Sequence, residues 1–202
     1  KALRSAQAHA AGCHVDTGTV RRLAGAGKGC YLVTLFGRRQ GLLFDRARHP
    51  EIAGLTSLAD PSLRFADRQP LSGTWHLARR LCAEAGVTLN DRATVGPFVS
   101  HLELALAIRR GEADLGLGTQ LAAEQCGLSF LELHLEAFRL AVPLAFAGHP
   151  RMAAFLVFVL ETLKTTAAAG VSGYEFTDSG HLDTVPPEPD PPASAHPNRS
   201  GR

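Results

Sequence analysis

The stretch Leu63-Arg-Phe-Ala-Asp-Arg-Gln-Pro-Leu-Ser-Gly-Thr-Trp-His-Leu-Ala-Arg-Arg80 predicts a short strand, a polar loop and the start of a helix. Ser72 stands where a helix N-cap is expected, Gly73 lets a ligand approach the backbone, and Thr74 adds a hydroxyl to the first turn. The free N–H groups of a helix N-terminus carry roughly half a positive charge, which suits a small anion. With Arg68 as a countercharge, we expect an anion-binding site; an ordinary capped helix is the alternative interpretation.

Predicted strands and helices alternate outward from this stretch. The helix at 72–85 ends at Gly86, and Ser100-His-Leu-Glu103 is a capping box that begins a second helix, so that Ser100 and His101 are candidates for another wall of the site. This alternation predicts an α/β layered fold with a largely parallel sheet. Further strands are predicted at 8–13, 30–36, 41–44, 93–98, 113–117, 129–135 and 138–142, and further helices at 119–126 and, mostly buried, 150–163.

The composition fits a globular chain without an obvious nucleic-acid surface. The 202 residues are 45% hydrophobic, and the 21 basic and 19 acidic residues are interspersed, which excludes a basic stripe. Four widely spaced cysteines indicate reduced thiols and a cytoplasmic location. The longest strongly apolar run, 152–160, is too short to span a bilayer, and no membrane segment is expected. The proline-rich segment 181–202 is predicted to be disordered.

An internal similarity suggests two lobes. Residues 2–12 and 107–117 each read as a helix end, a polar turn and a short strand, although chance similarity in an alanine-rich chain is the alternative. If each unit belongs to one lobe, Cys13 and His14 face Thr119 across a shared cleft. The nine histidines show no ligand spacing, so no metal and no cofactor are expected. Ser72 lacks the Gly-x-Ser-x-Gly pattern of a nucleophile elbow, and no catalytic set can be assembled.

Six segments together resemble a known family. They are Ala11-Gly-Cys-His14, Gln40-Gly-Leu-Leu43, Arg64-Phe-Ala-Asp-Arg-Gln69 with Ser72-Gly-Thr74, Ser100-His101, Gly111-Glu-Ala-Asp-Leu-Gly-Leu-Gly118 and Leu140-Ala-Val-Pro143. Their order resembles the periplasmic-binding-protein-like domain of the molybdate-binding type over residues 1–180. The resemblance implies a two-lobed type 2 fold with three-layer αβα lobes. Relatives begin with a strand and loop that would precede Lys1, so an N-terminally truncated fold is expected.

The resemblance also implies a function. Such domains are often joined to a helix-turn-helix domain in cytoplasmic regulators, so contact with DNA is expected only through a domain absent from this chain. We expect a non-enzymatic sensor for a small oxyanion such as molybdate or tungstate. The alternatives are a cofactor-handling enzyme domain and a secreted receptor of a transporter, and a homodimer is one arrangement that the sequence allows.

The expected domain organisation follows from the same family resemblance. Lobe 1 comprises residues 1–42 and 141–180, and lobe 2 comprises residues 43–140. The expected ligand-binding residues are Ser72, Gly73, Thr74, Arg68, Cys13, His14, Ser100, His101 and Thr119.

Overall fold

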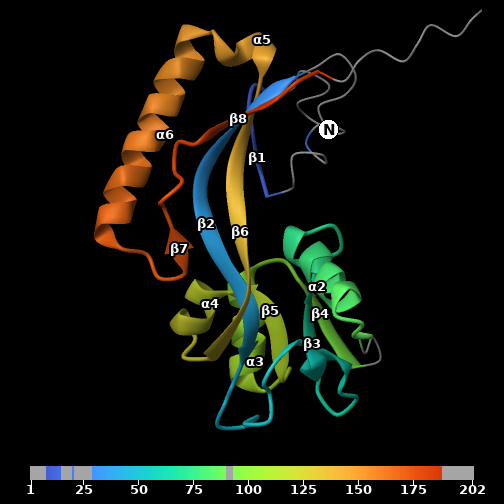
Figure 1. The fold of residues 1–202 in the computed structure, drawn as a ribbon. Coiled ribbons are helices and arrows are strands. Elements are labelled where there is room, and N and C mark those ends of the chain that lie inside the picture. The colour runs from blue at the N-terminus through green and yellow to red at the C-terminus, as the bar shows by residue number, and fades with distance from the viewer. Residues whose placement is uncertain (1–7, 15–19, 21–28, 90–92, 188–202) are drawn as a thin grey trace, which may run out of the picture.

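Two long strands run side by side through both lobes of the molecule (Figure 1). The computed structural model describes residues 8–14, 20, 29–89 and 93–187. Strands β2 (Cys30–Phe44) and β6 (Ser129–Pro143) are each 15 residues long and pair antiparallel along their whole length. The two lobes therefore share one curved sheet, in the order β1-β6-β2-β5-β3-β4, with β7 and β8 also paired to β2.

The prediction that each long strand is two short strands was wrong. Residues 37–40 continue β2 instead of forming a turn, and the irregularity is limited to register shifts at Thr34/Phe36 and Gln40/Gly41. The polar residues 38–40 fit a strand because Arg38 forms an ion pair with Glu136, which lies directly opposite it on β6. The expectation of a parallel sheet fails here as well, because β2 and β6 are antiparallel.

Lobe 2 has the expected three layers. Strands β3 (Phe65–Arg68), β4 (Thr94–Phe98) and β5 (Leu115–Thr119) are parallel to one another, and β5 pairs with β2. One hydrophobic cluster joins the sheet to α2 (Gly73–Glu84), and a second joins it to α3 (His101–Arg110) and α4 (Gln120–Gln125). A short 3-10 helix, η1 (Leu55–Ala59), packs on the α2 side.

Lobe 1 is built on the other halves of the same two strands. β1 (Ala11–Cys13) pairs with β6, and β7 (Tyr174–Glu175) and β8 (Leu182–Val185) pair with β2. Helices α5 (Leu144–Ala147) and α6 (Pro150–Ala169) cover one face of this sheet. The predicted disorder from residue 181 was wrong for β8, and residues 188–202 lie outside the described residues. The predicted lobe boundaries fall within β2 and β6 and stay predictions.

Helix α6 differs most from its prediction. It is six residues longer than expected, and Met152 is its only buried residue. The prediction failed because residues 152–160 of this helix are apolar on all sides, which is typical of a buried helix, whereas here only one face meets the sheet. By length and composition α6 could cross a membrane: it has 20 residues, a mean hydropathy of 1.5, and 6% of the apolar window buried.

The close approach of β2 and β6 predicts a strict requirement for glycine at position 41. A Cβ on Gly41 would lie 2.1 Å from the backbone oxygen of Leu131, which cannot move without breaking the strand pairing. We expect Gly41→Ala to lower the free energy of unfolding by about 1 to 3 kcal/mol, measured by urea denaturation. The control is Gly54→Ala, because Gly54 is extended and a Cβ added there would have no atom within 4 Å. Equal stability of the two variants would contradict the assigned register.

Candidate functional site

The N-terminus of α2 faces the long strands. The Ser72 Oγ accepts a hydrogen bond of 3.1 Å from the Trp75 N–H, as expected for an N-cap. The hydroxyl of Thr74 is buried and donates to the Gln40 Oε1 on β2 at 3.0 Å. The first turn of α2 is therefore tied to the middle of β2, where the strand passes from one lobe to the other.

Gln40 lies at the centre of the sheet with an unpaired amide nitrogen among the described residues. It is paired with Thr119 on β5 and His134 on β6, and side chains that lie directly opposite one another point to the same face of a sheet. The side chain of Gln40 is fully buried, yet its Nε2 has no hydrogen-bond partner among the described residues. An amide nitrogen can only donate, so this position lacks an acceptor.

Arg68 holds the junction between β4 and α3. Its Nε donates to the Phe98 carbonyl at 3.1 Å and its Nη2 to the Val99 carbonyl at 2.8 Å. Its Nη1 is buried and has no partner in the described part of the chain. Burial, followed by the nearby Arg38, lowers the pKa of Arg68. The predicted countercharge is thus partly committed to structure, with one N–H group left over.

The N-terminus of α3 is fully capped. The predicted capping box is present: the Ser100 Oγ accepts from the Glu103 N–H at 3.1 Å, and the Glu103 carboxylate accepts from the Ser100 N–H at 3.2 Å. The hydroxyl of Ser100 is therefore already engaged.

His101 follows this cap and is unusual in its electrostatics. Its Nδ1 is buried and has no hydrogen-bond partner among the residues described. Burial first, then the positive charges of Arg68 and Arg38, lowers the pKa of His101 to about 3. The imidazole is therefore neutral at physiological pH, although it lies beside two cations.

Every buried side-chain polar atom that lacks a partner in the described ranges is a nitrogen. Leaving such a group unpaired costs free energy of the order of 1 to 3 kcal/mol. The unpaired atoms lie on the two long strands and at the ends of β3 and α3 that face them. They are Arg38 Nε, Gln40 Nε2, Arg68 Nη1, His101 Nδ1 and Arg139 Nε.

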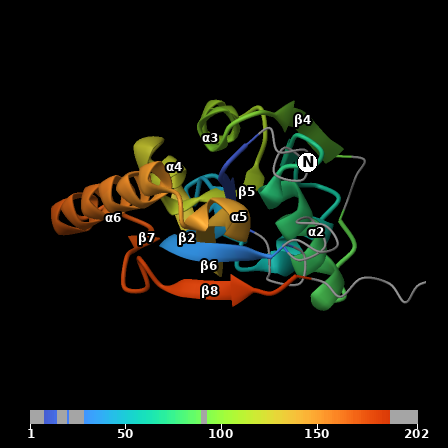
Figure 2. The same ribbon diagram turned by 90° about the horizontal axis from the view of Figure 1, so that it is seen from above.

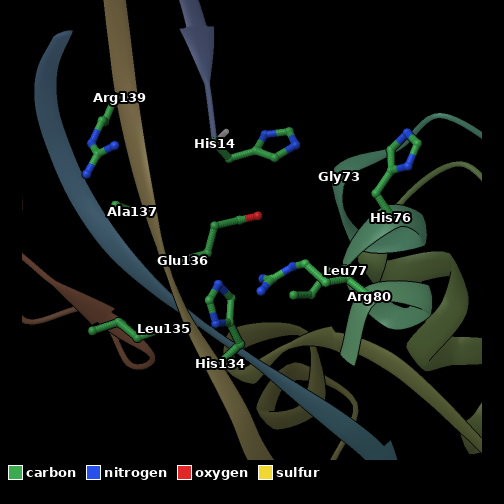
Figure 3. Close-up of a pocket in the computed structure, with 10 residues that line it drawn as sticks. All are labelled: His14, Gly73, His76, Leu77, Arg80, His134, Leu135, Glu136, Ala137 and Arg139. Atoms are coloured by element: carbon green, nitrogen blue, oxygen red, sulfur yellow. The ribbon is translucent and has the colours of Figure 1, made fainter. Parts of the chain in front are cut away.

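A pocket of about 770 Å³ lies between lobe 1, β6 and α2 (Figure 3). His14 enters it from lobe 1, the side chain of Arg80 points from α2 toward β6, and the carboxylate of Glu136 points from β6 toward α2. The pocket adjoins the group of unpaired nitrogens, because Glu136, which lines the pocket, forms an ion pair with Arg38. The lining residues are His14, Gly73, His76, Leu77, Arg80, His134, Leu135, Glu136, Ala137 and Arg139.

The lining has an excess of basic groups. Glu136 is the only carboxylate among the described residues that line the pocket, and Arg38 neutralises it. Burial and then the charge of Arg80 lower the pKa of His134. Asp67 at the end of β3 is compensated by Arg79 at 2.7 Å. Arg80 also forms an ion pair with the exposed Glu84 at 3.2 Å, so the lining carries more cationic than anionic side chains by a small margin.

The first-lobe residues predicted for the site have different surroundings. His14 lies against the start of α2, since a Cβ at Gly73 would be 1.9 Å from its Nε2. Glycine at position 73 thus permits contact between the lobes. Cys13 instead packs against the core cluster that contains Cys30 and Leu32. Among the described residues no group of three or more His, Cys, Asp or Glu could hold a metal ion.

The structure brings together only part of the predicted set. Thr74 and Thr119 lie beside Gln40, Arg68 and His101 lie close to each other and to Arg38, and Gly73 and His14 border the pocket. Ser72 and Ser100 act as helix caps, and the side chain of Thr119 also accepts from the Ala122 N–H at 3.4 Å.

Sequence reasoning missed most of the residues supplied by the long strands. The signal lies in β6, where Glu132, His134 and Glu136 alternate with leucines. In β2 the polar residues 38–40 are consecutive, a pattern that predicts a turn. The missed residues of the long strands are Arg38, Gln40, His134, Glu136 and Arg139, and two missed residues of α2 are His76 and Arg80.

Comparison with solved structures shows the fold. The tungstate ABC transporter protein from Geobacter sulfurreducens has a TM-score of 0.59 and 16% identity, with 83% of this chain and 79% of that chain covered. The CcmR regulatory domain from Synechocystis PCC6803, in complex with 2-PG, has a TM-score of 0.62 and 15% identity, covering 81% and 77%. The ancestral amino acid-binding protein AncCDT-1, a precursor of cyclohexadienyl dehydratase, has a TM-score of 0.53 and 14% identity, covering 82% and 67%.

Sequence comparison gives the family. No curated protein matches the chain. The model of the PBP superfamily domain, however, matches residues 1–160, which is most of the chain, and the two-lobed α/β fold with a pocket beside its long strands agrees with that match. The chain belongs to the PBP superfamily domain family and is a ligand-binding domain of the type 2 periplasmic-binding-protein fold.

Proposed function

We propose that this domain binds a small oxyanion between its lobes, where the long strands meet the N-terminus of α2. The supporting observation is that the buried unpaired atoms of the described residues are all nitrogens, contributed by Arg38, Gln40, Arg68, His101 and Arg139. An oxyanion brings several acceptor oxygens and a negative charge to donors that are already desolvated, so little reorganisation opposes binding. The ends of parallel strands next to a helix N-terminus are a common place for such a ligand.

The ligand would also hold the lobes together. His14 approaches the start of α2 from lobe 1, while Gln40 and Thr74 belong to the opposite wall. A ligand that contacts both walls favours the closed arrangement, because it gains all its contacts only there. Molybdate and tungstate are the proposed ligands. Two proteins of similar fold, a tungstate transporter protein and a regulatory domain in complex with 2-PG, are compatible with an anionic ligand. Closure would transmit binding to a helix-turn-helix domain in a cytoplasmic regulator.

Binding explains the pocket better than catalysis does. One structural neighbour is a precursor of a dehydratase, and a dehydratase needs groups that accept and donate protons. In the part of the pocket that the structure describes, Glu136 is the only carboxylate, and it is already engaged in an ion pair with Arg38. We therefore rank a sensor above a cofactor-handling enzyme domain. A secreted transport receptor would use the same binding chemistry.

Replacing Gln40 by Glu tests the proposed anion site. Gln40→Glu keeps an oxygen for the Thr74 hydroxyl but exchanges the unpaired N–H₂ for a negative oxygen. We expect affinity for the best of molybdate, tungstate, sulfate and phosphate to fall by about 1.5 to 3 kcal/mol, roughly tenfold to a hundredfold, in titration calorimetry. Gln125→Glu makes the same chemical change on the exposed end of α4 and should leave affinity unchanged.

Two results would count against the site. Absence of binding by all four anions to the unaltered chain would rule out the oxyanion assignment. Equal affinities of Gln40→Glu and Gln125→Glu, with both variants folded, would place the ligand elsewhere.

The partly buried His101, with its lowered pKa, predicts a pH-dependent stability. Its pKa is about 3 when folded and about 6.5 when unfolded, so between these values the unfolded chain binds a proton that the folded chain does not. The contribution of His101 to stability is complete above pH 6.5 and is lost as pH falls toward 3, by up to about 1.4 kcal/mol per pH unit. We expect His101→Gln to weaken this dependence, measured by urea denaturation from about pH 7 to about pH 5.

The comparison needs a second histidine variant. His181→Gln changes an exposed histidine beside Asp183 and should leave the loss of stability at low pH close to that of the unaltered chain. If the stability of His101→Gln falls with pH as steeply as that of His181→Gln, the imidazole of His101 is not buried in its neutral form.

A further inference from the structure

Helix α6 presents an apolar face to solvent on the outside of lobe 1. In Figures 1 and 2 it lies at the edge of the molecule, on the side away from α2. The exposed fractions are 44% for Phe155, 62% for Val157 and 69% for Phe158. On the opposite face, Met152 and Leu156 join the core cluster of lobe 1. A helix fixed along one side and apolar along the other fits a protein partner.

The exposed face is complementary to itself about the position of Leu156. Residues at equal distances before and after Leu156 differ in size or in charge. They form the pairs Ala154 with Phe158, Phe155 with Val157, and Arg151 with Glu161. An α-helix has 3.6 residues per turn, so Ala154, Phe158, Arg151 and Glu161 lie close to the side of α6 opposite Leu156. Phe155 and Val157 lie on either side of these residues. All six residues are exposed.

We propose that α6 pairs antiparallel with α6 of a second copy of this chain, around a two-fold axis opposite Leu156. Each Phe158 then lies over the small Ala154 of the other copy, while Phe155 and Val157 lie on the two sides of this contact. The charges agree with this direction, because Arg151 of each copy faces Glu161 of the other. Among the described residues the Glu161 carboxylate forms an ion pair only with the exposed Lys164, at 2.7 Å, and such a pair contributes little.

The opposite direction is disfavoured. Parallel helices in a two-fold pair bring identical residues together, so that Phe158 meets Phe158, Arg151 meets Arg151 and Glu161 meets Glu161. Large side chains then meet large ones and like charges meet, whereas the antiparallel pair places large side chains against small ones and opposite charges together.

A bilayer is a poorer partner than a second copy. Although α6 has the length and hydropathy of a membrane-spanning helix, its Met152, Leu156 and Leu160 belong to the core of lobe 1. A helix attached to a sheet along one side cannot be surrounded by lipid. One helix pair buries an area at the low end for specific interfaces, so we expect weak association that depends on concentration.

Sedimentation velocity of the full chain across the micromolar range tests this proposal. We expect a monomer and dimer in equilibrium. Phe158→Asp should weaken association at least roughly tenfold, because it places a charge at the centre of the contact. The control Leu106→Asp changes an exposed apolar residue on α3 of lobe 2 and should leave association unchanged.

Charge reversal tests the direction of the pair. Arg151→Glu alone should weaken association, and adding Glu161→Arg should restore it, since the opposed charges are exchanged. A chain that is monomeric throughout the micromolar range overturns the proposal. So does a dimer that Phe158→Asp does not weaken, or a double reversal that folds normally but does not restore association. Flotation of a monomeric chain with phosphatidylcholine and phosphatidylglycerol vesicles, abolished by Phe158→Asp, would instead assign this face to lipid.

Discussion

The antiparallel pairing of β2 with β6 is the constraint on which the rest of the structure depends. Each lobe uses one half of this pair as the centre of its sheet, and the helices of both lobes pack on those halves. Gly41 allows the strands to approach at a register shift, and the ion pair between Arg38 and Glu136 lets charged residues occupy their middle. Because the same strands belong to both lobes, a change in their curvature moves one lobe relative to the other.

The proposed site lies at this shared segment for an electrostatic reason. Ordinary hydrogen bonding satisfies most buried polar groups of a protein, whereas here several donors on and beside the long strands remain unpaired among the described residues. The hydrogen bond from Thr74 to Gln40 brings the positive end of α2 to the same place. Burial and the cations Arg68 and Arg38 keep His101 neutral, so the region combines fixed positive charge with desolvation. An anionic ligand relieves both conditions at once.

The pocket and the outer face of α6 have separate proposed roles, ligand binding and self-association. The pocket lies between lobe 1 and α2, and α6 lies on the opposite side of the molecule from α2 (Figure 2). Lobe 1 connects them through the cluster that includes Val33, Leu140 and Met152. Association through α6 would therefore leave the pocket open to ligand, and closure of the lobes would alter the orientation of one cleft relative to the other in a pair.

The sequence by itself determined the local structure of lobe 2 and the family. Ser72 and Ser100 predict their helix starts because capping depends only on residues within one turn, and the three-layer alternation follows from short-range periodicity. Only the tertiary structure decided that β2 and β6 are continuous, because partners on a strand distant in the sequence stabilise the polar residues 38–40. It also decided where Cys13 packs and that α6 is exposed, since burial depends on distant neighbours rather than on composition.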